Sequence, residues 1–343
     1  MTPSSARAER NESSRSSPSS RLSVVTPAFN EQGSISLFYH ALCGTMSGLS
    51  CEWEWIPVDD HSHDDTFGMI ADIAGSDTRV NGIRLARNSG AHAAVLCGLQ
   101  HARGGCAVVI AADLQDPPGV IPQLFEKWKG GADVVWAVRE ERLGESRQTL
   151  LLARLYYWLM RRIVGLQSIP AQGADFFLVD RKVIDAVSRF SESNTSILAL
   201  LNWMGFRQES VSYVKQARAH GRSGWTLAKK VKLLLDSVTS FSFFPIRIMS
   251  VAGFCLALLG FLYALVVIVN AILRKPVQGY PSLMVAVLVI GGMQMLMMGI
   301  LGEYLWRTLD ESRRRPRFLI EETTERDSES ERSSEEENLH DKP

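Results

Sequence analysis

Two long apolar stretches near the carboxyl end most constrain how this chain can fold. Residues 246–273 and 281–306 are nearly all apolar, and each exceeds the roughly 20 helical residues that cross a hydrocarbon core of about 30 Å. Each stretch is therefore predicted to be a membrane-spanning helix. Because the turn 274–280 between them is short, the two helices are predicted to form a hairpin with both ends on one side of the membrane.

Basic residues around this hairpin predict its orientation. The flanking set is Lys229, Lys230, Lys232 and Arg247 before it, and Arg307, Arg313, Arg314, Arg315 and Arg317 after it. Arg274 and Lys275 in the turn favour the opposite orientation more weakly. Since cytoplasmic flanks carry the excess of Lys and Arg, we predict a multi-pass protein of the inner or plasma membrane. Both termini and the long amino-terminal part are then cytoplasmic.

Residues 21–215 have the pattern of an α/β domain. The β-rich runs LSVV, WEWIPV, VNGIRL, CAVVIAA and ADVVWAV alternate with helical patterns near 34–48, 65–75, 89–102 and 119–130. This rhythm predicts a parallel sheet covered by helices, in which ligands bind beyond the carboxyl ends of the strands. Further along, a helix is predicted near 149–164, the strand-like runs DFFLV and VSYV follow, and a second helix lies between them near 195–205.

The remaining segments are polar or basic. Residues 1–20 are rich in Ser and Arg, and residues 307–343 are dense in Glu, Arg and Ser, so both are predicted to be disordered. Residues 216–245 combine a basic loop with a helix whose lysines alternate with apolar residues. This pattern fits an amphipathic helix at a membrane surface or, alternatively, a solvated basic helix face. The formal net charge of zero gives no bulk electrostatic case for binding nucleic acid.

Polar clusters follow the first two predicted strands. The segment VTPAFNE lies where a strand ends and a helix begins, which suits a phosphate or a polar ring edge; an ordinary loop with Asn30 as helix cap is the alternative. The segment VDDHSHDD places several carboxylates in one loop. They repel one another unless a cation, a base edge or ribose hydroxyls engage them. His61 and His63 alone are a weak signal for zinc.

A third cluster, AADLQDPP, follows the apolar run AVVIAA. Asp113 and Gln115 are two residues apart, and their oxygens can hold a hard cation such as Mg²⁺ or Mn²⁺ that bridges a diphosphate. Asp116 precedes Pro117 and Pro118, so for this residue helix capping is the preferred interpretation.

Five motifs occur in a fixed order along the chain: PAFNE, VDDHSHDD, RNSGAHAAVLCGL, AADLQDPP and GADFFLVD. With the terminal hairpin, they make the chain from about Leu22 to Trp306 resemble the family 2 glycosyltransferases, specifically polyprenyl-phosphate sugar synthases such as dolichyl-phosphate mannose synthase and the bactoprenol glucosyltransferases. The resemblance implies a Rossmann-like GT-A catalytic domain on the cytoplasmic side, followed by interfacial amphipathic helices and a two-helix transmembrane hairpin.

The resemblance also implies roles for particular residues. Those around the nucleotide are Pro27, Phe29, Glu31, Asp59 and Asp60, while Asp113 and Gln115 are at the metal and Asp175 is at the position associated with catalysis. Where the family has two aspartates in a DxD motif, this chain has Ala111-Ala112-Asp113. We therefore expect Asp113, Gln115 and the donor's diphosphate, together with water, to hold the ion. Phe177 stands where many relatives carry Arg, so one phosphate contact is predicted to be lost.

The segment RAHGRSGW resembles the family's basic loop near the lipid phosphate. The residues implied there are Arg218, Arg222, Ser223 and, further on, Lys229. Guanidinium groups pair bidentately with phosphate oxygens, although a merely flexible surface loop has the same composition. Gly224 stands where close relatives often have Lys.

The predicted function is transfer of a sugar from a nucleotide donor, by resemblance a UDP-sugar, to an undecaprenyl- or dolichyl-type phosphate with inversion. The implied partners are the donor, the polyprenyl phosphate and the membrane, and the sequence leaves a homo-oligomer and a flippase partner open. Two alternatives stand beside it. One is a transferase that elongates a glycan or modifies another lipid, and the other is an inactive membrane relative, motivated by Ala111 and Phe177.

Overall fold

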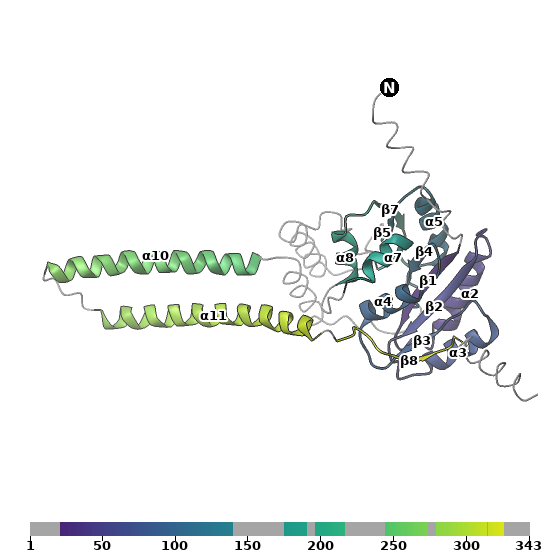
Figure 1. Cartoon of the computed structure of the whole chain (residues 1–343), viewed down its shortest axis with the longest axis horizontal. Helices are drawn as coiled ribbons and strands as arrows, with labels where there is room; N and C mark the ends of the chain where they lie inside the picture. The colour runs from purple at the N-terminus through teal and green to yellow at the C-terminus, as the bar shows by residue number, and fades with distance from the viewer. Residues whose placement is uncertain are drawn as a thin grey trace, which may run out of the picture.

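The computed structural model describes residues 21–139, 175–190, 196–216, 244–273, 279–313 and 315–325. They form an α/β domain from which two long helices project (Figure 1). The predictions for the segment 1–20, the helix near 149–164 and the amphipathic helix within 217–243 lie outside the described residues.

One mixed sheet organises the domain, with strand order β7-β5-β6-β4-β1-β2-β3-β8. The strands are β1 (Leu22–Ala28), β2 (Trp53–Asp59), β3 (Ile83–Leu85), β4 (Cys106–Val109), β5 (Val134–Arg139), β6 (Phe177–Asp180), β7 (Gln208–Tyr213) and β8 (Ile320–Thr323). The parallel arrangement predicted within 22–138 is confirmed, whereas β6 pairs antiparallel with both β4 and β5. The sequence does not reveal this reversal, because a short apolar run reads the same in either direction.

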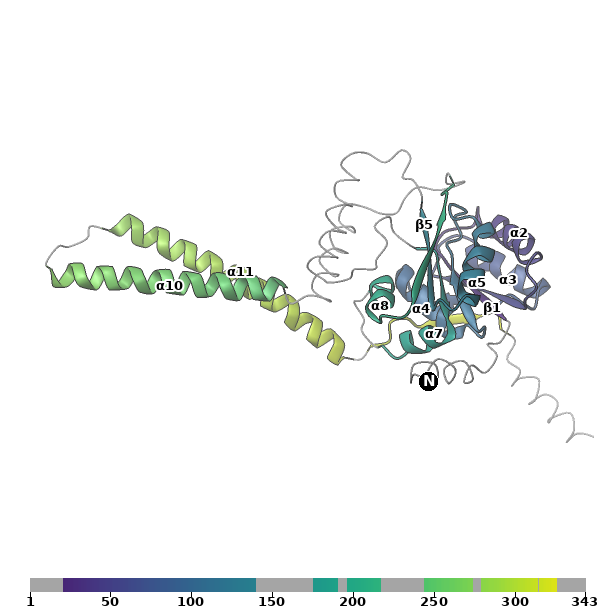
Figure 2. The ribbon, with the colours of Figure 1, turned by 90° about the horizontal axis from the view of Figure 1, so that it is seen from above.

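Helices cover both faces of this sheet (Figure 2). One face is packed by α2 (Ile35–Met46), α3 (Thr66–Ser76) and α5 (Ile121–Lys129), which follows the short 3₁₀ turn η1 (Pro118–Val120). The other face is packed by α4 (Ala91–His101), α7 (Arg181–Val187) and α8 (Ile197–Trp203). The predicted boundaries of α2, α3, α4 and α5 each differ from the observed ones by at most two residues. Helix α7 was not predicted.

The close approach of α4 to the sheet depends on a glycine. A Cβ atom added at Gly98 would lie 2.3 Å from Val25 Cγ1 and 3.2 Å from Val58 Cγ2. No side-chain carbon fits at that distance, since interiors are packed to the density of organic crystals. Gly98 thereby lets α4 lie directly on β1 and β2, the two strands that carry the first polar clusters.

The projecting helices are α10 (Phe244–Ile272) and α11 (Tyr280–Ser312). They lie side by side in both views, and Met297 of α11 would be 3.6 Å from a Cβ at Gly253 of α10 (Figures 1 and 2). In the part of the chain that the structure describes, one segment, Ile248–Asn270, is long and apolar enough to cross a membrane by length and composition. The second predicted span stays a prediction.

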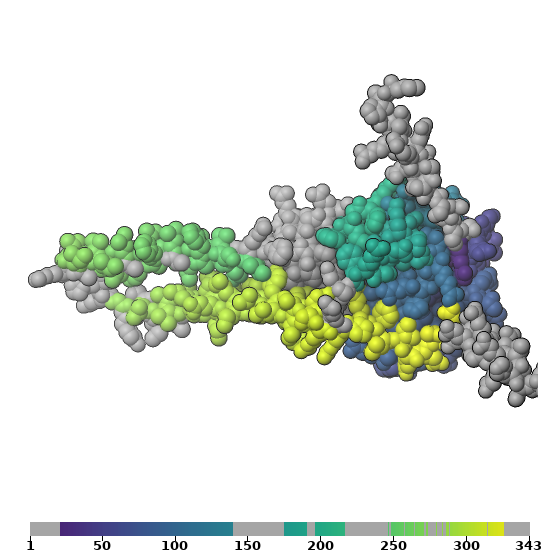
Figure 3. All heavy atoms as spheres, viewed as in Figure 1, coloured from purple at the N-terminus to yellow at the C-terminus, as the bar shows by residue number. Residues whose placement is uncertain are grey.

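Within residues 307–325 the structure corrects the prediction of a disordered tail over 307–343, whereas residues 326–343 lie outside the described residues. Helix α11 continues to Ser312, and β8 then pairs antiparallel with β3 at the edge of the sheet. Figure 3 shows this segment lying along the surface of the α/β domain. Composition is a poor guide here, because the strand consists of four exposed residues whose stability comes from a partner strand more than 200 residues earlier in the chain.

Candidate active site

The first two polar clusters meet at the carboxyl ends of β1 and β2. Their register pairs Ala28 with Asp59, and the Asp60 amide donates a hydrogen bond to the Ala28 carbonyl at 2.9 Å. Adjacent parallel strands that end together bring the loops that follow them together as well. Pro27 is half-buried at the end of β1, and Phe29, just beyond it, is exposed.

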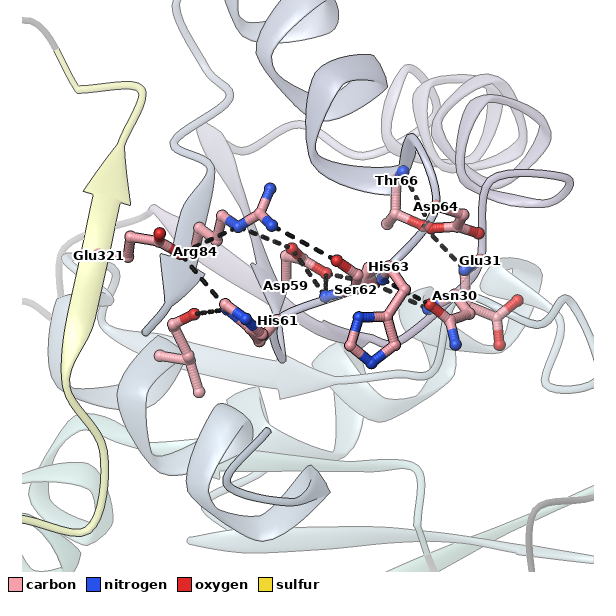
Figure 4. Close-up of polar contacts among 11 residues, drawn as sticks. Asn30, Glu31, Asp59, His61, Ser62, His63, Asp64, Thr66, Arg84 and Glu321 are labelled. Carbon is pink, nitrogen blue, oxygen red and sulfur yellow. Dashed lines mark hydrogen bonds and ion pairs between the residues drawn. The ribbon is translucent and has the colours of Figure 1, made fainter. Parts of the chain in front are cut away.

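Hydrogen bonds between the two loops fix their geometry (Figure 4). The Asn30 amide donates to Ser62 Oγ at 2.9 Å, and the His63 amide donates to Asn30 Oδ1 at 2.9 Å. The Glu31 amide donates to Thr66 Oγ1, also at 2.9 Å. Asn30 has a φ of 54°, a left-handed conformation that Asn tolerates better than most residues. The alternative of Asn30 as a helix cap is wrong, because Ser34 occupies the N-cap of α2.

Asp59 is fully buried at the end of β2. Its carboxylate accepts hydrogen bonds from the Ser62 amide at 3.1 Å and from the Ser62 hydroxyl. Arg84 of β3 lies on its other side, with Nε 3.8 Å from Asp59 Oδ2. A buried carboxylate held between a hydroxyl and a guanidinium is a polar anchor at the floor of the site.

Asp60 is also buried but faces a different element. Its two carboxylate oxygens accept hydrogen bonds from the amides of Ser89 at 2.6 Å and Gly90 at 2.8 Å, directly before α4. Burial raises the pKa of Asp60, and these two amides act in the opposite direction. Asp60 therefore fixes the start of α4 beside the site.

Replacement of Asp60 by Ala is expected to lower the free energy of unfolding by about 1.5–3 kcal/mol, the usual range for hydrogen bonds to a charged group. The reason is that two partly buried amides, of Ser89 and Gly90, lose their acceptor. Thermal unfolding of the detergent-solubilised protein, followed by circular dichroism, measures the change. Asp72→Ala, on the surface-exposed part of α3, is the matched control, and equal melting temperatures for the two variants would contradict the assignment.

The two histidines of the second loop take separate positions. His61, with a φ of 60°, places Nδ1 3.0 Å from the Leu85 carbonyl oxygen. His63 makes an edge contact with Phe29 at a ring-centroid distance of 6.0 Å. No group of three or more His, Cys, Asp or Glu side chains suited to a metal ion occurs in the described ranges.

The third cluster lies at the carboxyl end of β4, which neighbours β1. Leu114 has a φ of 58°, and the Gln115 amide donates to Asp113 Oδ1 at 3.1 Å. The Asp113 and Gln115 side chains are half-buried. The turn is tied to the end of β7, because the Gln216 amide donates to the Gln115 carbonyl at 2.9 Å.

Asp116 does not cap a helix, which corrects the preferred interpretation. The N-cap of the following 3₁₀ turn is Pro117. The Asp116 carboxylate, which is almost completely buried, instead accepts a hydrogen bond from the Tyr213 hydroxyl and lies 3.9 Å from Lys215 Nζ. Asp116 therefore joins the third cluster to β7.

Sequence reasoning missed two basic residues at this edge of the sheet. Arg139 ends β5, with Nη2 3.6 Å from Asp175 Oδ2 and Nε donating to the Tyr213 hydroxyl at 3.4 Å. Lys215 follows β7, and burial lowers the pKa of its ammonium group. Both side chains are largely buried, although Asp175 is exposed. Inspection of the residue that follows each strand, as done for β1, β2 and β4, would have found both of them.

Phe177, which stands where many relatives carry Arg, belongs to the core of the domain. The side chain is buried in β6 and packs against Trp136, with ring centroids 5.4 Å apart. Arg218, Arg222, Ser223 and Lys229, predicted near a lipid phosphate, lie outside the described residues.

Comparisons with known proteins give two family-profile matches and several similar relatives. Residues 23–188 match the glycosyl transferase family 2 profile, and residues 244–307 match the GtrB C-terminal hairpin profile. The bactoprenol glucosyl transferase of Shigella phage SfV is 37% identical over 301 residues, which cover 88% of this chain and 98% of that protein. A prophage bactoprenol glucosyl transferase homolog of Escherichia coli K12 gives the same values. An uncharacterized glycosyltransferase of Synechocystis is 35% identical over 300 residues, covering 87% and 94%.

Among solved structures, glucosyl-3-phosphoglycerate synthase from Mycobacterium tuberculosis, in complex with Mn²⁺, UDP and phosphoglyceric acid, aligns with a TM-score of 0.49 and 19% identity. The alignment covers 66% of this chain and 80% of that one. A likeness of this degree does not place a ligand in this chain. The profile match and relatives that are 37% identical over 98% of their length establish the family: this chain is a glycosyltransferase that belongs to glycosyl transferase family 2.

Proposed function

We propose that this glycosyltransferase moves a sugar from a nucleotide donor, with uridine diphosphate as the leaving group, to the phosphate of a polyprenyl lipid at the cytoplasmic face of the membrane. The observation that carries the proposal is its 37% identity to bactoprenol glucosyl transferases over 98% of their length, including the hairpin region. A site with both buried carboxylates and cations supports it, because such a site suits two phosphate-bearing substrates.

The donor's nucleoside is assigned to the paired loops after β1 and β2. Pro27, Phe29 and Glu31 line one loop, and Asp59 is buried beneath the other. A carboxylate can accept hydrogen bonds from a base N–H or from ribose hydroxyls. The backbone of these loops is held by side-chain hydrogen bonds on both sides, so the loops are ordered before the donor arrives, which reduces the entropic cost of binding.

A divalent cation is assigned to the turn after β4. One carboxylate and one carboxamide, from Asp113 and Gln115, are hard oxygen ligands of the type that Mg²⁺ and Mn²⁺ accept. With Ala111 and Ala112 before them, the ion would depend on diphosphate oxygens and water for its other ligands. When bound, the ion supplies charge neutralisation for the departing diphosphate.

The acceptor phosphate is assigned to the opposite side of the turn, near Arg139 and Asp175. A phosphate monoester has a second pKa near 6 and is already nucleophilic at neutral pH, so Asp175 has little need to act as a base. The ion pair at 3.6 Å instead orients the Arg139 guanidinium. Arg218, Arg222, Ser223 and Lys229 are proposed to complete the cationic surface around the same phosphate.

The chemical step is a single displacement. A lipid phosphate oxygen attacks the anomeric carbon, a new C–O bond forms, and the bond from that carbon to the diphosphate oxygen breaks. The electron pair leaves with the nucleoside diphosphate, so the anomeric configuration inverts. The protein's part is to hold the two reactants in line, which converts a bimolecular reaction into an effectively unimolecular one.

Helices α10 and α11 are proposed to anchor the enzyme where its acceptor lies. Large apolar side chains on both helices are exposed, among them Val251, Phe254, Phe261, Met295 and Leu301. Apolar surface of this extent marks contact with a membrane or a partner. Two spans are proposed from the length and apolar composition of the helices, and cytoplasmic termini from the basic residues around them. Confinement to the surface raises the effective concentration of the acceptor.

The function is tested with the full-length protein in lipid nanodiscs that contain undecaprenyl phosphate. Radiolabelled UDP-sugars are offered with Mg²⁺ or Mn²⁺, and the lipid products are separated by chromatography. One sugar added per lipid phosphate supports the proposal. Products with longer sugar chains identify a glycan-elongating enzyme, and donor binding without turnover identifies an inactive relative; either result overturns the proposed reaction.

A further inference from the structure

The strand that follows the membrane hairpin contacts the nucleotide side of the catalytic domain. β8 is bonded to β3 through the Ala86 amide, which donates to the Leu319 carbonyl at 2.8 Å, and the Thr324 amide, which donates to the Gly82 carbonyl at 2.9 Å. The Gly82 amide donates to Thr324 Oγ1 at 2.7 Å. Figures 1 and 3 show the segment reaching this edge of the sheet directly from α11.

The pairing of β8 with β3 contains an irregularity at Glu321. Arg84 is opposite Glu322, and Leu85 is opposite Ile320, so the register shifts by one residue between them. Glu321 is thus an additional residue on β8, as in a β-bulge. Bulges redirect a side chain and are frequent beside active sites.

The Glu321 side chain points to the site (Figure 4). Its Oε2 lies 3.1 Å from Arg84 Nε and 3.4 Å from His61 Nδ1. Both partners belong to the candidate nucleotide site, since His61 is in the loop after β2 and Arg84 is next to Asp59. A residue from the carboxyl-terminal segment therefore takes part in the polar network around the donor loops.

Arg84 connects Glu321 to Asp59. Its Nε is 3.1 Å from Glu321 but 3.8 Å from Asp59, and its Nη2 donates to the Ser62 carbonyl at 3.4 Å. The guanidinium also lies over the Phe67 ring, 5.6 Å from its centroid. Arginine binds a single carboxylate most strongly through two parallel hydrogen bonds. With Glu321 present, Arg84 is shared between two carboxylates, and the Asp59 pair stays the longer of the two.

We propose that Glu321 is a positioning residue of the donor site. By holding Arg84 and His61 towards β8, it leaves the buried Asp59 carboxylate to Ser62, whose hydrogen bonds fix the loop after β2. Without it, Arg84 turns fully to Asp59, and a bidentate pair competes with the Ser62 hydrogen bonds that hold this donor loop in place. The inference rests on the proposed nucleotide role of Asp59. The donor site is then complete only when the segment after α11 is paired with β3.

The experiment compares Glu321→Gln with Glu322→Gln in the full-length protein in nanodiscs. Glu322 is the exposed neighbour on the same strand and serves as the matched control. The Glu321 side chain is half-exposed, and an exposed ion pair contributes little free energy. We therefore expect the KM for the UDP-sugar to rise by only about threefold to fivefold. The kcat should stay within about twofold of wild type. Glu322→Gln should leave both constants unchanged.

A double-variant cycle tests whether Glu321 acts through Arg84. In an Arg84→Met background, Glu321→Gln should add no further increase in KM. An unchanged KM in the single variant, or an equal increase in both backgrounds, overturns the proposal. A lower melting temperature with an unchanged KM also overturns it, since that result assigns Glu321 to the stability of the strand. Failure of the wild-type protein to bind or use any UDP-sugar counts against the proposed function instead.

Discussion

Asp113→Ala should lower kcat for sugar transfer by about 10²–10³-fold or more, the usual loss when a group that stabilises charge in the transition state is removed. Ala111 and Ala112 leave Asp113 as the only carboxylate among the three residues that directly follow β4 and Ile110. No second protein carboxylate in that triplet can replace it. The measurement is transfer from a radiolabelled UDP-sugar to undecaprenyl phosphate in nanodiscs, at several Mn²⁺ concentrations.

The matched control is Asp185→Ala. Asp185 is an exposed carboxylate on α7 that forms an ion pair with Arg181 at 3.8 Å. Its loss should therefore leave sugar transfer unchanged. Asp113→Asn should retain part of the activity at high Mn²⁺, because a carboxamide oxygen still coordinates weakly. Wild-type kcat in Asp113→Ala at every Mn²⁺ concentration would remove this residue from the site.

Arg139→Ala should lower kcat/KM for the polyprenyl phosphate by about 10²-fold, as expected when a largely buried group that pairs with phosphate is removed. The guanidinium is placed by Asp175 and by the Tyr213 hydroxyl. Arg139→Lys should recover little of the loss, since an ammonium group cannot reproduce the planar, bidentate geometry. Steady-state kinetics with varied lipid acceptor at saturating donor measure the effect.

Binding of UDP separates a role at the acceptor from a structural role. Its Kd should be the same for wild type and Arg139→Ala, because the partners of Arg139, Asp175 and Tyr213, belong to elements other than the loops after β1 and β2. Arg207→Ala is the control, because it removes a cation at the opposite end of β7. Arg207 pairs with Glu209 at 3.1 Å. If Arg139→Ala weakens UDP binding as much as it weakens use of the acceptor, Arg139 does not belong specifically to the acceptor side.

The regular part of the fold was predictable because its signals are local. The buried strands β1, β2, β4 and β5 are separated by helices at regular intervals, and the rule that ligands bind at strand ends then placed Asp59 and Asp113 at one edge. The same rule, applied to β5 and β7, would have added Arg139 and Lys215. They were missed because their strands carry no recognised motif, although the resemblance covered the segments around them.

Other features depend on tertiary contacts that the sequence does not record. Asp59 and Asp60 are adjacent and chemically identical, yet one accepts from Ser62 in its own loop and the other holds the start of α4. Asp116 looked like a helix cap because of the two prolines after it, whereas its partner is Tyr213, nearly a hundred residues later. Capping propensity is a local preference, and a long-range hydrogen bond to a buried carboxylate outweighs it.

The residues of β8 were the hardest to predict from the sequence. Nothing in a short exposed run such as IEET distinguishes a strand from a solvated tail, and the stability of β8 derives from hydrogen bonds with Gly82 and Ala86, which flank β3. The bulge at Glu321 is harder still to predict, because it exists only as a shift in register between two paired strands.

The docked strand also bears on how the enzyme is prepared for study. A water-soluble fragment cut before the hairpin would lack β8, and β3 would then end the sheet with unsatisfied amides at Gly82 and Ala86. Bare edges of this kind recruit other chains and promote aggregation. A fragment in which residues 315–325 are rejoined to the catalytic domain through a flexible linker keeps that edge covered, and it is the better starting point for crystallisation.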